Sequence, residues 1–242
     1  MRGLLPPPVE IGGRESGALP PDGELTPDLV RAALGLPAHA GIVAADLVLP
    51  NRPPQLCAGC PHGDTFTALK KALDGMEPPV VTSDIGCYTL GALQPYSAIE
   101  SCVCMGASVG MAKGASDAGL KPAVALIGDS TFLHSGLTPL IDAVAARTDM
   151  TLIILDNKAV AMTGGQTTIM SSSALRDAVL GTGLEPAHLQ VIDAHPGTAD
   201  HNADVIRREL EYQGTSVVIA VRECLETIKA RKKETAQMET AS

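Results

Sequence analysis

Short runs of apolar, largely β-branched residues alternate with helix-like stretches from about residue 51 onward. The apolar runs are nearly continuous, which is typical of strands that are covered on both faces. The predicted strands are Val80–Ser83, Ala123–Ile127, Thr151–Leu155, Leu189–Asp193 and Ser216–Val221. The predicted helices between them include Leu137–Arg147, Ser173–Leu180 and Asp200–Gln213. This alternation predicts an α/β fold with a mainly parallel sheet flanked by helices.

The first 50 residues have a different pattern. Ten of the 18 prolines lie within the first 54 residues, which excludes a regular sheet or a long helix there. One short helix is expected, because Thr26 suits the N-cap, Pro27 suits the first helical position and Gly35 is a stop signal. We therefore expect a Pro-rich arm or linker over 1–50, an α/β domain over 51–225 and a charged tail over 226–242.

Composition and charge exclude several classes of function. Lys and Arg total 18 against 27 Asp and Glu, so the net charge of -9 argues against a nucleic-acid-binding surface. Aromatic residues make up only 2%, which leaves little for stacking on bases. No apolar run reaches the roughly 20 residues that cross a bilayer, and the first ten residues have too short an apolar stretch for a secretory signal. The sequence predicts a cytoplasmic protein without a membrane span.

Polar residues directly follow two consecutive predicted strands. Asp129 comes after the strand that ends at Ile127, and Asn157 comes after the strand that ends at Leu155. Because the carboxyl ends of neighbouring parallel strands meet at one edge of a sheet, these two oxygen ligands are expected to share a hard cation such as Mg²⁺. The backbone carbonyl of Ala159 is a candidate third oxygen. The alternative is that these are ordinary polar residues of loops.

Glycine-containing segments at the same predicted edge suit a phosphate group. Gly128 permits close approach of the backbone, and the loop Thr163–Gln166 is flexible and rich in donors. Gly128, Asp129 and Ser130, followed by Asn157 after the next strand, resemble the diphosphate-binding motif of thiamine diphosphate enzymes.

Four of the six cysteines suit a metal or a cluster. Two of them, Cys57 and Cys60, form a CxxC turn. Cys87 follows the first predicted strand, and Cys224 follows the last. Cysteines in such positions are able to surround a [4Fe-4S] cluster. Two alternatives are a structural zinc ion on the four and a redox dithiol at the CxxC turn. The other two, Cys102 and Cys104, are expected to be small core residues.

Taken in order, the motifs resemble the thiamine diphosphate domain of the 2-oxoacid:ferredoxin oxidoreductases, and most of all the large subunit of the indolepyruvate type. The segments that carry the resemblance are 52–62, 84–91, 104–110, 128–136 and 156–166. The match extends over about residues 25–225, which would make 51–225 the thiamine diphosphate-binding domain.

This resemblance implies roles for individual residues. Asp129, Asn157 and the Ala159 carbonyl would bind Mg²⁺ on the diphosphate, and the four cysteines would hold a [4Fe-4S] cluster. Residues implied to contact the cofactor are Gly86, Gly106, Gly128, Asp129, Ser130, Asn157, Thr163 and Gly164. His62 and His134 lie inside the motifs and would orient the substrate carboxylate or move a proton. The alternative for each is a structural histidine.

The implied activity is the oxidative decarboxylation of a 2-oxoacid to an acyl-CoA, with coenzyme A as co-substrate and electron transfer to ferredoxin. The family's pyrimidine-binding domain is not found in this sequence, so the chain is expected to be one subunit of a split enzyme or a fragment. Expected partners are a subunit with the pyrimidine-binding domain, a gamma/beta-type subunit and ferredoxin or a ferredoxin-like subunit. The alternatives are a subunit of a non-oxidative thiamine diphosphate-dependent decarboxylase and a non-catalytic assembly module.

Overall fold

The computed structural model describes residues 11–37 and 53–240 of the chain. Contacts divide the chain into two units, Met1–Arg52 and Pro53–Ser242, and each is considered by itself. In the first unit, helix α1 (Pro27–Ala33) begins where the sequence predicts it: Thr26 is the N-cap and its hydroxyl accepts a hydrogen bond from the N–H of Leu29. Residues 1–10 and 38–50 of the predicted arm lie outside the described residues.

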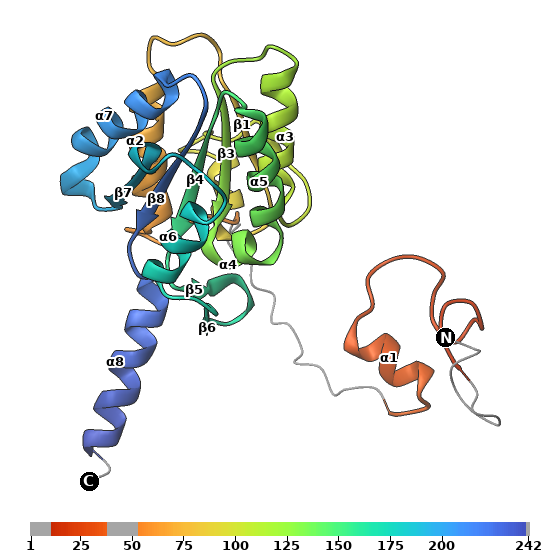
Figure 1. The fold of residues 1–242 in the computed structure, drawn as a ribbon. Coiled ribbons are helices and arrows are strands. Elements are labelled where there is room, and N and C mark those ends of the chain that lie inside the picture. The colour runs from red at the N-terminus through yellow and green to blue at the C-terminus, as the bar shows by residue number, and fades with distance from the viewer. Residues whose placement is uncertain (1–10, 38–52, 241–242) are drawn as a thin grey trace. The chain divides into compact units, whose positions relative to one another are not determined.

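Six parallel strands form the sheet of the second unit, in the order β2-β1-β3-β4-β8-β7 (Figure 1). Their bounds are β1 (Val80–Ser83), β2 (Ser101–Cys102), β3 (Ala123–Gly128), β4 (Met150–Asp156), β7 (Leu189–Asp193) and β8 (Thr215–Val221). Each strand that the sequence predicted is present, and its ends differ from the prediction by no more than one residue. The predicted α/β fold with a parallel sheet is therefore confirmed.

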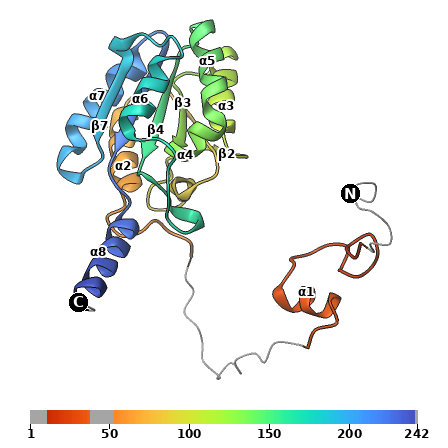
Figure 2. The ribbon, with the colours of Figure 1, turned by 60° about the horizontal axis from the view of Figure 1, so that its bottom comes forward.

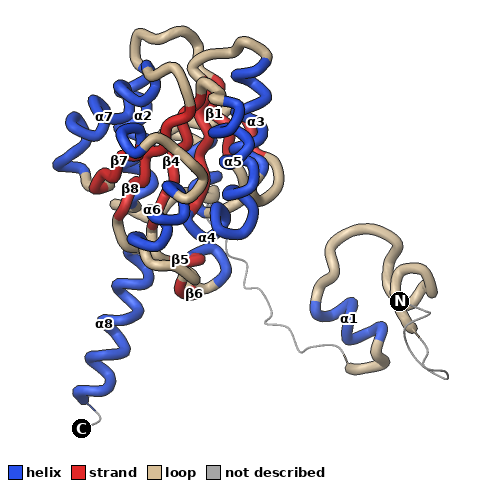
Figure 3. Tube along the Cα trace, viewed as in Figure 1, coloured by secondary structure: helices blue, strands red, loops and turns tan. Residues whose placement is uncertain are grey.

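Helices cover both faces of this sheet (Figures 2 and 3). They are α2 (Pro61–Leu73), α3 (Ala107–Asp117), α5 (Leu137–Ala146), α6 (Ser172–Leu180) and α7 (Ala199–Glu211). Successive strand residues enter opposite cores: Leu126 packs in the core that includes α2 and α7, and Ile127 packs in the core that includes α3, α5 and α6. Burial on both faces explains why the strands read as continuous apolar runs rather than as alternating ones.

The direction in which the chain adds strands reverses next to β1. From β1 the chain moves outward to the edge strand β2, and α3 then returns it to β3 on the other side of β1. In parallel sheets, such a reversal leaves a crevice at the carboxyl ends of the strands that flank it. The short elements α4 (Asp129–Thr131), β5 (Ala159–Val160) and β6 (Gln166–Thr167) lie at this edge, the lower one in Figure 1.

The C-terminal segment forms helix α8 (Leu225–Thr240), which projects away from the α/β body (Figure 1). Within the described part of the chain, no helix is long and apolar enough to cross a membrane.

The prediction that Cys102 and Cys104 are core residues is wrong. Cys102 is half-buried and Cys104 is exposed. The reason is that Cys102 ends β2, the two-residue strand at the edge of the sheet, so the chain leaves the sheet there. Cys104 belongs to the exposed connection that leads to Gly106, whose φ of 83° starts helix α3.

Candidate functional site

Three buried polar residues end the neighbouring strands β3 and β4. Asp129 follows β3, Asp156 is the last residue of β4 and Asn157 follows it; their exposed fractions are 4%, 3% and 6%. The backbone N–H of Lys158 donates to Oδ2 of Asp129 at 2.9 Å and to Oδ1 of Asp156 at 3.2 Å. The two carboxylates thus share one N–H donor, and Asn157 Oδ1 accepts the N–H of the next residue, Ala159, at 3.1 Å.

The electrostatics of these carboxylates favour a cation. Burial in the first place, and the neighbouring Asp156 carboxylate after it, raise the pKa of Asp129 to about 7. Oδ2 of Asp156 is buried without a hydrogen-bond partner among the described residues. A hard divalent cation takes oxygen ligands and would neutralise two adjacent buried carboxylates. The donor set therefore fits Mg²⁺, with Asp129, Asn157 and the carbonyl of Ala159 as candidate ligands.

A narrow cavity of about 140 Å³ opens beside these residues. The predicted site residues that line it are His62, Gly86, Cys87, Gly128, Asp129, Ser130, Asn157, Ala159 and Thr163. Apolar side chains of Ile85, Met105 and Met162 complete part of its wall. These three are 42%, 45% and 54% exposed, so the mouth of the cavity has an uncovered apolar rim.

Three of the residues predicted to contact the cofactor or the substrate do not line this cavity. His134 is exposed, and its Nδ1 lies 3.1 Å from the hydroxyl of Ser135. Gly164 is exposed in the loop before β6. Gly106 is buried behind the wall, where its N–H donates to Oδ2 of Asp84 at 3.0 Å. The roles predicted for these residues stay predictions.

Asp84 and Tyr88 form a buried network that the sequence analysis did not single out. Asp84 is fully buried at the end of β1 and accepts hydrogen bonds from the Tyr88 hydroxyl, the Gly106 N–H and the Ser108 hydroxyl. Burial raises the pKa of Asp84, and burial followed by the Asp84 charge raises the pKa of Tyr88. The available signal was the position of Asp84 after a strand, which it shares with Asp129.

The ring of Tyr88 also explains one of the predicted glycines. A Cβ on Gly128 would lie 2.6 Å from a ring carbon of Tyr88. The sequence suggested close approach of a diphosphate at Gly128; the structure adds a tyrosine ring that requires the same lack of a side chain.

Substituting Asp84 by alanine is expected to lower the free energy of unfolding by about 3 kcal/mol or more. The loss of Asp84 leaves the Gly106 N–H, the Ser108 hydroxyl and the Tyr88 hydroxyl buried without their acceptor, and each such group costs about 1–3 kcal/mol. Urea unfolding of both proteins measures the change. Asp84→Asn is the matched control, because it keeps one acceptor oxygen, and an Ala variant as stable as the Asn variant would contradict the assignment.

The four predicted cluster ligands come together from three segments of the chain. The N–H of Cys60 donates to the carbonyl of Cys57 at 3.0 Å, and α2 begins with Pro61 directly after this turn. Cys87 starts a 3-10 helix after β1, and Cys224 follows β8. In addition to burial, negative charge on Cys57 and Cys224 raises the pKa of both Cys60 and Cys87, so the four thiols are electrostatic neighbours.

The surroundings of these thiols disfavour unligated thiolates. Burial in the first place raises the pKa of Cys60 to about 11, and burial likewise raises the pKa of Cys87. Among the described residues, no group of three or more His, Cys, Asp or Glu side chains is arranged so that it could hold a metal ion. A [4Fe-4S] cluster does not need its ligands grouped around one ion, because each thiolate binds a separate iron. Four convergent cysteines have the donor chemistry for such a cluster.

His62 lies between the cysteine turn and the cation site. It is the second residue of α2, is 3% exposed, and its Nε2 lies 3.3 Å from Nδ2 of Asn157. Its ring meets that of Tyr88 edge to face, at a centroid distance of 6.0 Å. Burial lowers the pKa of His62 to about 4, so the ring is neutral near pH 7.

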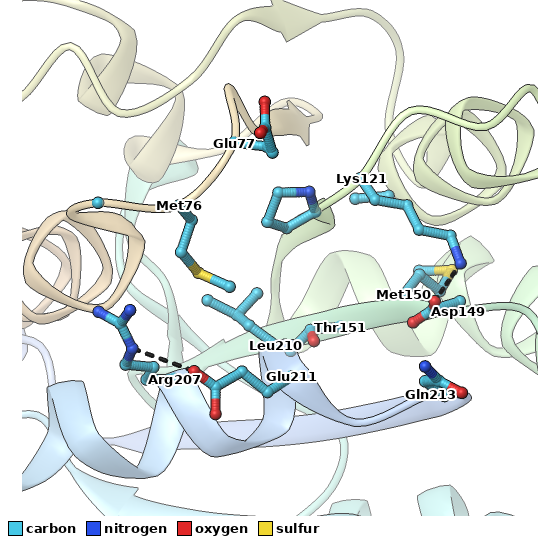
Figure 4. Close-up of a pocket in the computed structure, with 13 residues that line it drawn as sticks. Met76, Glu77, Lys121, Asp149, Met150, Thr151, Arg207, Leu210, Glu211 and Gln213 are labelled. Atoms are coloured by element: carbon cyan, nitrogen blue, oxygen red, sulfur yellow. Dashed lines mark hydrogen bonds and ion pairs between the residues drawn. The ribbon is translucent and has the colours of Figure 1, made fainter.

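A larger pocket of about 440 Å³ lies at the opposite edge of the sheet, where β3 and β4 begin (Figure 4). Lys121 pairs there with Asp149, and Arg207 pairs with Glu211 at 3.2 Å. Four of its five charged side chains are therefore paired with one another, and the fifth is that of Glu77. The cavity at the carboxyl edge lies beside the buried carboxylates that end β3 and β4, and we take that cavity as the candidate functional site.

Comparison with protein families finds a matching family model. Residues 84–220 match the model described as "Thiamine pyrophosphate enzyme, C-terminal TPP binding domain". This range begins at the buried Asp84 and ends near the end of β8, so it contains both carboxylates of the candidate cation site.

Similar curated proteins carry the name "Indolepyruvate oxidoreductase subunit IorA". The one from Archaeoglobus fulgidus is 36% identical over 93% of this chain and 39% of its own length. The one from Methanothermobacter marburgensis is 38% identical over 90% of this chain and 37% of its own length. The chain thus spans about two fifths of the length of these relatives.

A solved structure with a similar fold is a 2-oxoglutarate:ferredoxin oxidoreductase from Magnetococcus marinus with 2-oxoglutarate, coenzyme A and succinyl-CoA bound. The two chains superpose with a TM-score of 0.56 over 72% of this chain and 66% of the other, at 16% identity. At that identity the likeness concerns the fold alone.

Proposed function

Because the chain belongs to the thiamine pyrophosphate enzymes, as their C-terminal TPP binding domain, we propose that it is the cofactor-binding part of a 2-oxoacid:ferredoxin oxidoreductase. The observation that carries the proposal is the pair of buried carboxylates beside Asn157, at the carboxyl edge of the sheet. The names of the relatives favour an indolepyruvate or other arylpyruvate as the 2-oxoacid.

In this proposal Asp129, Asn157 and the carbonyl of Ala159 would bind Mg²⁺, which would neutralise the diphosphate of the cofactor. Ser130 and Thr163, with the backbone of Gly86 and Gly128, line the same cavity and would supply hydrogen-bonding groups to the phosphate oxygens. When bound, thiamine diphosphate supplies the electron sink that lets a 2-oxoacid lose carbon dioxide. The chain's own contribution is to bind and orient the cofactor.

The four cysteines hold a [4Fe-4S] cluster in this proposal. Support comes from their convergence and from the high pKa of Cys60, because ligation to iron would stabilise a thiolate that burial disfavours. A cluster held there would supply a one-electron acceptor, which the transfer of electrons to ferredoxin requires.

The net reaction balances with two equivalents of ferredoxin. A 2-oxoacid anion, coenzyme A and two oxidised ferredoxins give an acyl-CoA, carbon dioxide, a proton and two reduced ferredoxins. The cavity of about 140 Å³ is smaller than the roughly 300–1,000 Å³ of typical ligand pockets. This size and the apolar rim support the proposal that a partner subunit with the pyrimidine-binding domain completes the site, within a hetero-oligomer that includes a gamma/beta-type subunit.

Activity is expected only in the assembled enzyme. The test is to purify the chain without oxygen, alone and co-expressed with the products of neighbouring genes, and to measure 2-oxoacid- and CoA-dependent reduction of ferredoxin. We expect turnover with the partners and none from the isolated chain. Turnover by the isolated chain would contradict the need for a partner. Carbon dioxide release without ferredoxin reduction would indicate a non-oxidative decarboxylase, and absence of thiamine diphosphate from the assembled complex would indicate an assembly module.

A further inference from the structure

The buried contact between His62 and Asn157 joins two parts of the proposed site. His62 follows the turn that carries Cys57 and Cys60, because α2 starts at Pro61. Asn157 follows β4 and is a candidate cation ligand. The Nε2 to Nδ2 distance of 3.3 Å is within hydrogen-bonding range for two side chains that are 3% and 6% exposed.

The hydrogen bonds of Asn157 determine which way its amide points. The backbone N–H of Ala159 donates to Oδ1 of Asn157 at 3.1 Å. A reversed amide would place two donors against each other and leave this N–H without an acceptor. Nδ2 therefore faces His62, and because Nδ2 is a donor, Nε2 of His62 must accept. The ring is then the tautomer that carries its proton on Nδ1.

This orientation leaves Oδ1 of Asn157 available to a cation. An amide oxygen has two lone pairs, of which the Ala159 N–H takes one. If His62 no longer held the NH₂ group, only the hydrogen bond from the Ala159 N–H would oppose a rotation that brings the NH₂ group to the place of the oxygen. An NH₂ group does not bind Mg²⁺, which takes oxygen ligands.

The main chain of Asn157 is held by another of the cysteine segments. Its carbonyl accepts the N–H of Cys224 at 3.0 Å, and the carbonyl of Asp156 accepts the N–H of Arg222 at 3.0 Å. The side chain and the main chain of Asn157 are therefore each held by a segment that carries a proposed cluster ligand.

We propose that His62 is a positioning residue, which through Nε2 fixes the Asn157 amide so that its oxygen faces the cation of the cofactor. The inference rests on the proposed function, because it takes Asn157 as a ligand of Mg²⁺. It assigns His62 a role other than proton transfer to the substrate, since the nitrogen that would accept a proton is engaged with Asn157. Removal of a group that orients a metal ligand typically lowers metal affinity about 10–100-fold.

The experiment uses the complex assembled with its partner subunits and three variants. His62→Leu removes the acceptor but retains bulk, and His62→Gln supplies an amide oxygen as acceptor. His201→Leu is the matched control, because His201 is exposed on α7. The measurements are Mn²⁺ affinity by electron paramagnetic resonance, Mg²⁺-dependent thiamine diphosphate affinity by calorimetry, and turnover.

We expect His62→Leu to weaken binding of Mn²⁺ and of the cofactor by about 10–100-fold. His62→Gln is expected to restore binding and to retain turnover, and the control is expected to match the unmodified complex. Unchanged affinity in His62→Leu would overturn the inference. So would a His62→Gln complex that binds normally but has lost turnover, because that result indicates proton transfer. If the Leu variant does not fold, the Gln variant alone decides between the two roles.

The same data separate this inference from the proposed function. Binding of Mg²⁺ and thiamine diphosphate by the unmodified complex, with equal binding by His62→Leu, would overturn only the role of His62. Failure of the unmodified complex to bind the cofactor would overturn both.

Discussion

Replacing Asp129 by asparagine is expected to weaken Mg²⁺-dependent binding of thiamine diphosphate by about 100-fold or more. Loss of a residue that only orients a metal ligand lowers metal affinity about 10–100-fold. Loss of a direct carboxylate ligand is therefore expected to lower the affinity by at least the upper end of that range. Asparagine also presents an NH₂ group to one of the two backbone N–H groups that Asp129 now binds, those of Ser130 and Lys158. Calorimetric titration at fixed Mg²⁺ concentration, with the chain in its complex, measures the effect.

The stability of the cofactor-free chain is expected to change in the opposite sense. Asp129 and Asp156 are two buried carboxylates with a shared N–H donor, and neutralising one of them removes their repulsion. The melting temperature of Asp129→Asn is therefore expected to stay level or rise while cofactor affinity falls. Asp142→Asn is the matched control, since its side chain is 70% exposed on α5. Equal loss of affinity in both variants, or undiminished affinity in Asp129→Asn, would contradict the assignment of the cation site.

Serine at both Cys57 and Cys60 is expected to remove the iron of the purified protein. With four thiolate ligands in place, about four irons per chain and a broad absorption near 400 nm are expected in protein kept free of oxygen. Loss of two ligands in the CxxC turn leaves Cys87 and Cys224, which are too few to retain a cubane cluster. Iron, sulfide and zinc analysis, together with bleaching by dithionite, provides the measurement.

The chain contains its own control for this experiment. Cys102 and Cys104 are outside the group of four thiols that interact with one another, and their double substitution by serine is expected to leave iron content unchanged. Four zinc-bound thiolates, or protein without any metal, would contradict the cluster and remove the electron path from this chain. Iron that disappears equally in both double variants would point to general damage instead.

The fold was predictable because its strands are buried on both faces. The runs at Ala123–Ile127 and Thr151–Leu155 are apolar at each position or nearly so, which marks both the strands and the helices that must cover them. The matched family model and the relatives named indolepyruvate oxidoreductase subunit together confirm the resemblance that the ordered motifs indicated. Strand β2 was not predicted, because two residues at a sheet edge carry no periodic pattern.

The location of a candidate site residue was predictable from the sequence where that residue directly follows a strand. Asp129 and Asn157 meet because β3 and β4 are neighbours. The contact of Tyr88 with Asp84 was not predictable, since it depends on the 3-10 helix that turns the ring back toward β1. The exposed position of His134 depends on a π-helical turn over Phe132–Gly136, which displaces side chains relative to a regular helix.

The ladder between β4 and β8 has a mechanical consequence. Asp156 is in register with Val221, and the bonds from Arg222 and Cys224 continue this pairing past the ends of both strands. Neighbouring strands are kept about 4.8 Å apart by their main-chain hydrogen bonds, whatever side chains they carry. The spacing between the proposed cofactor ligands and Cys224 is thus set by the backbone, so substitutions that reshape the proposed substrate pocket are expected to leave the separation of the two proposed redox groups unchanged. If the proposed function holds, specificity for the substrate is free to diversify without retuning the proposed electron path.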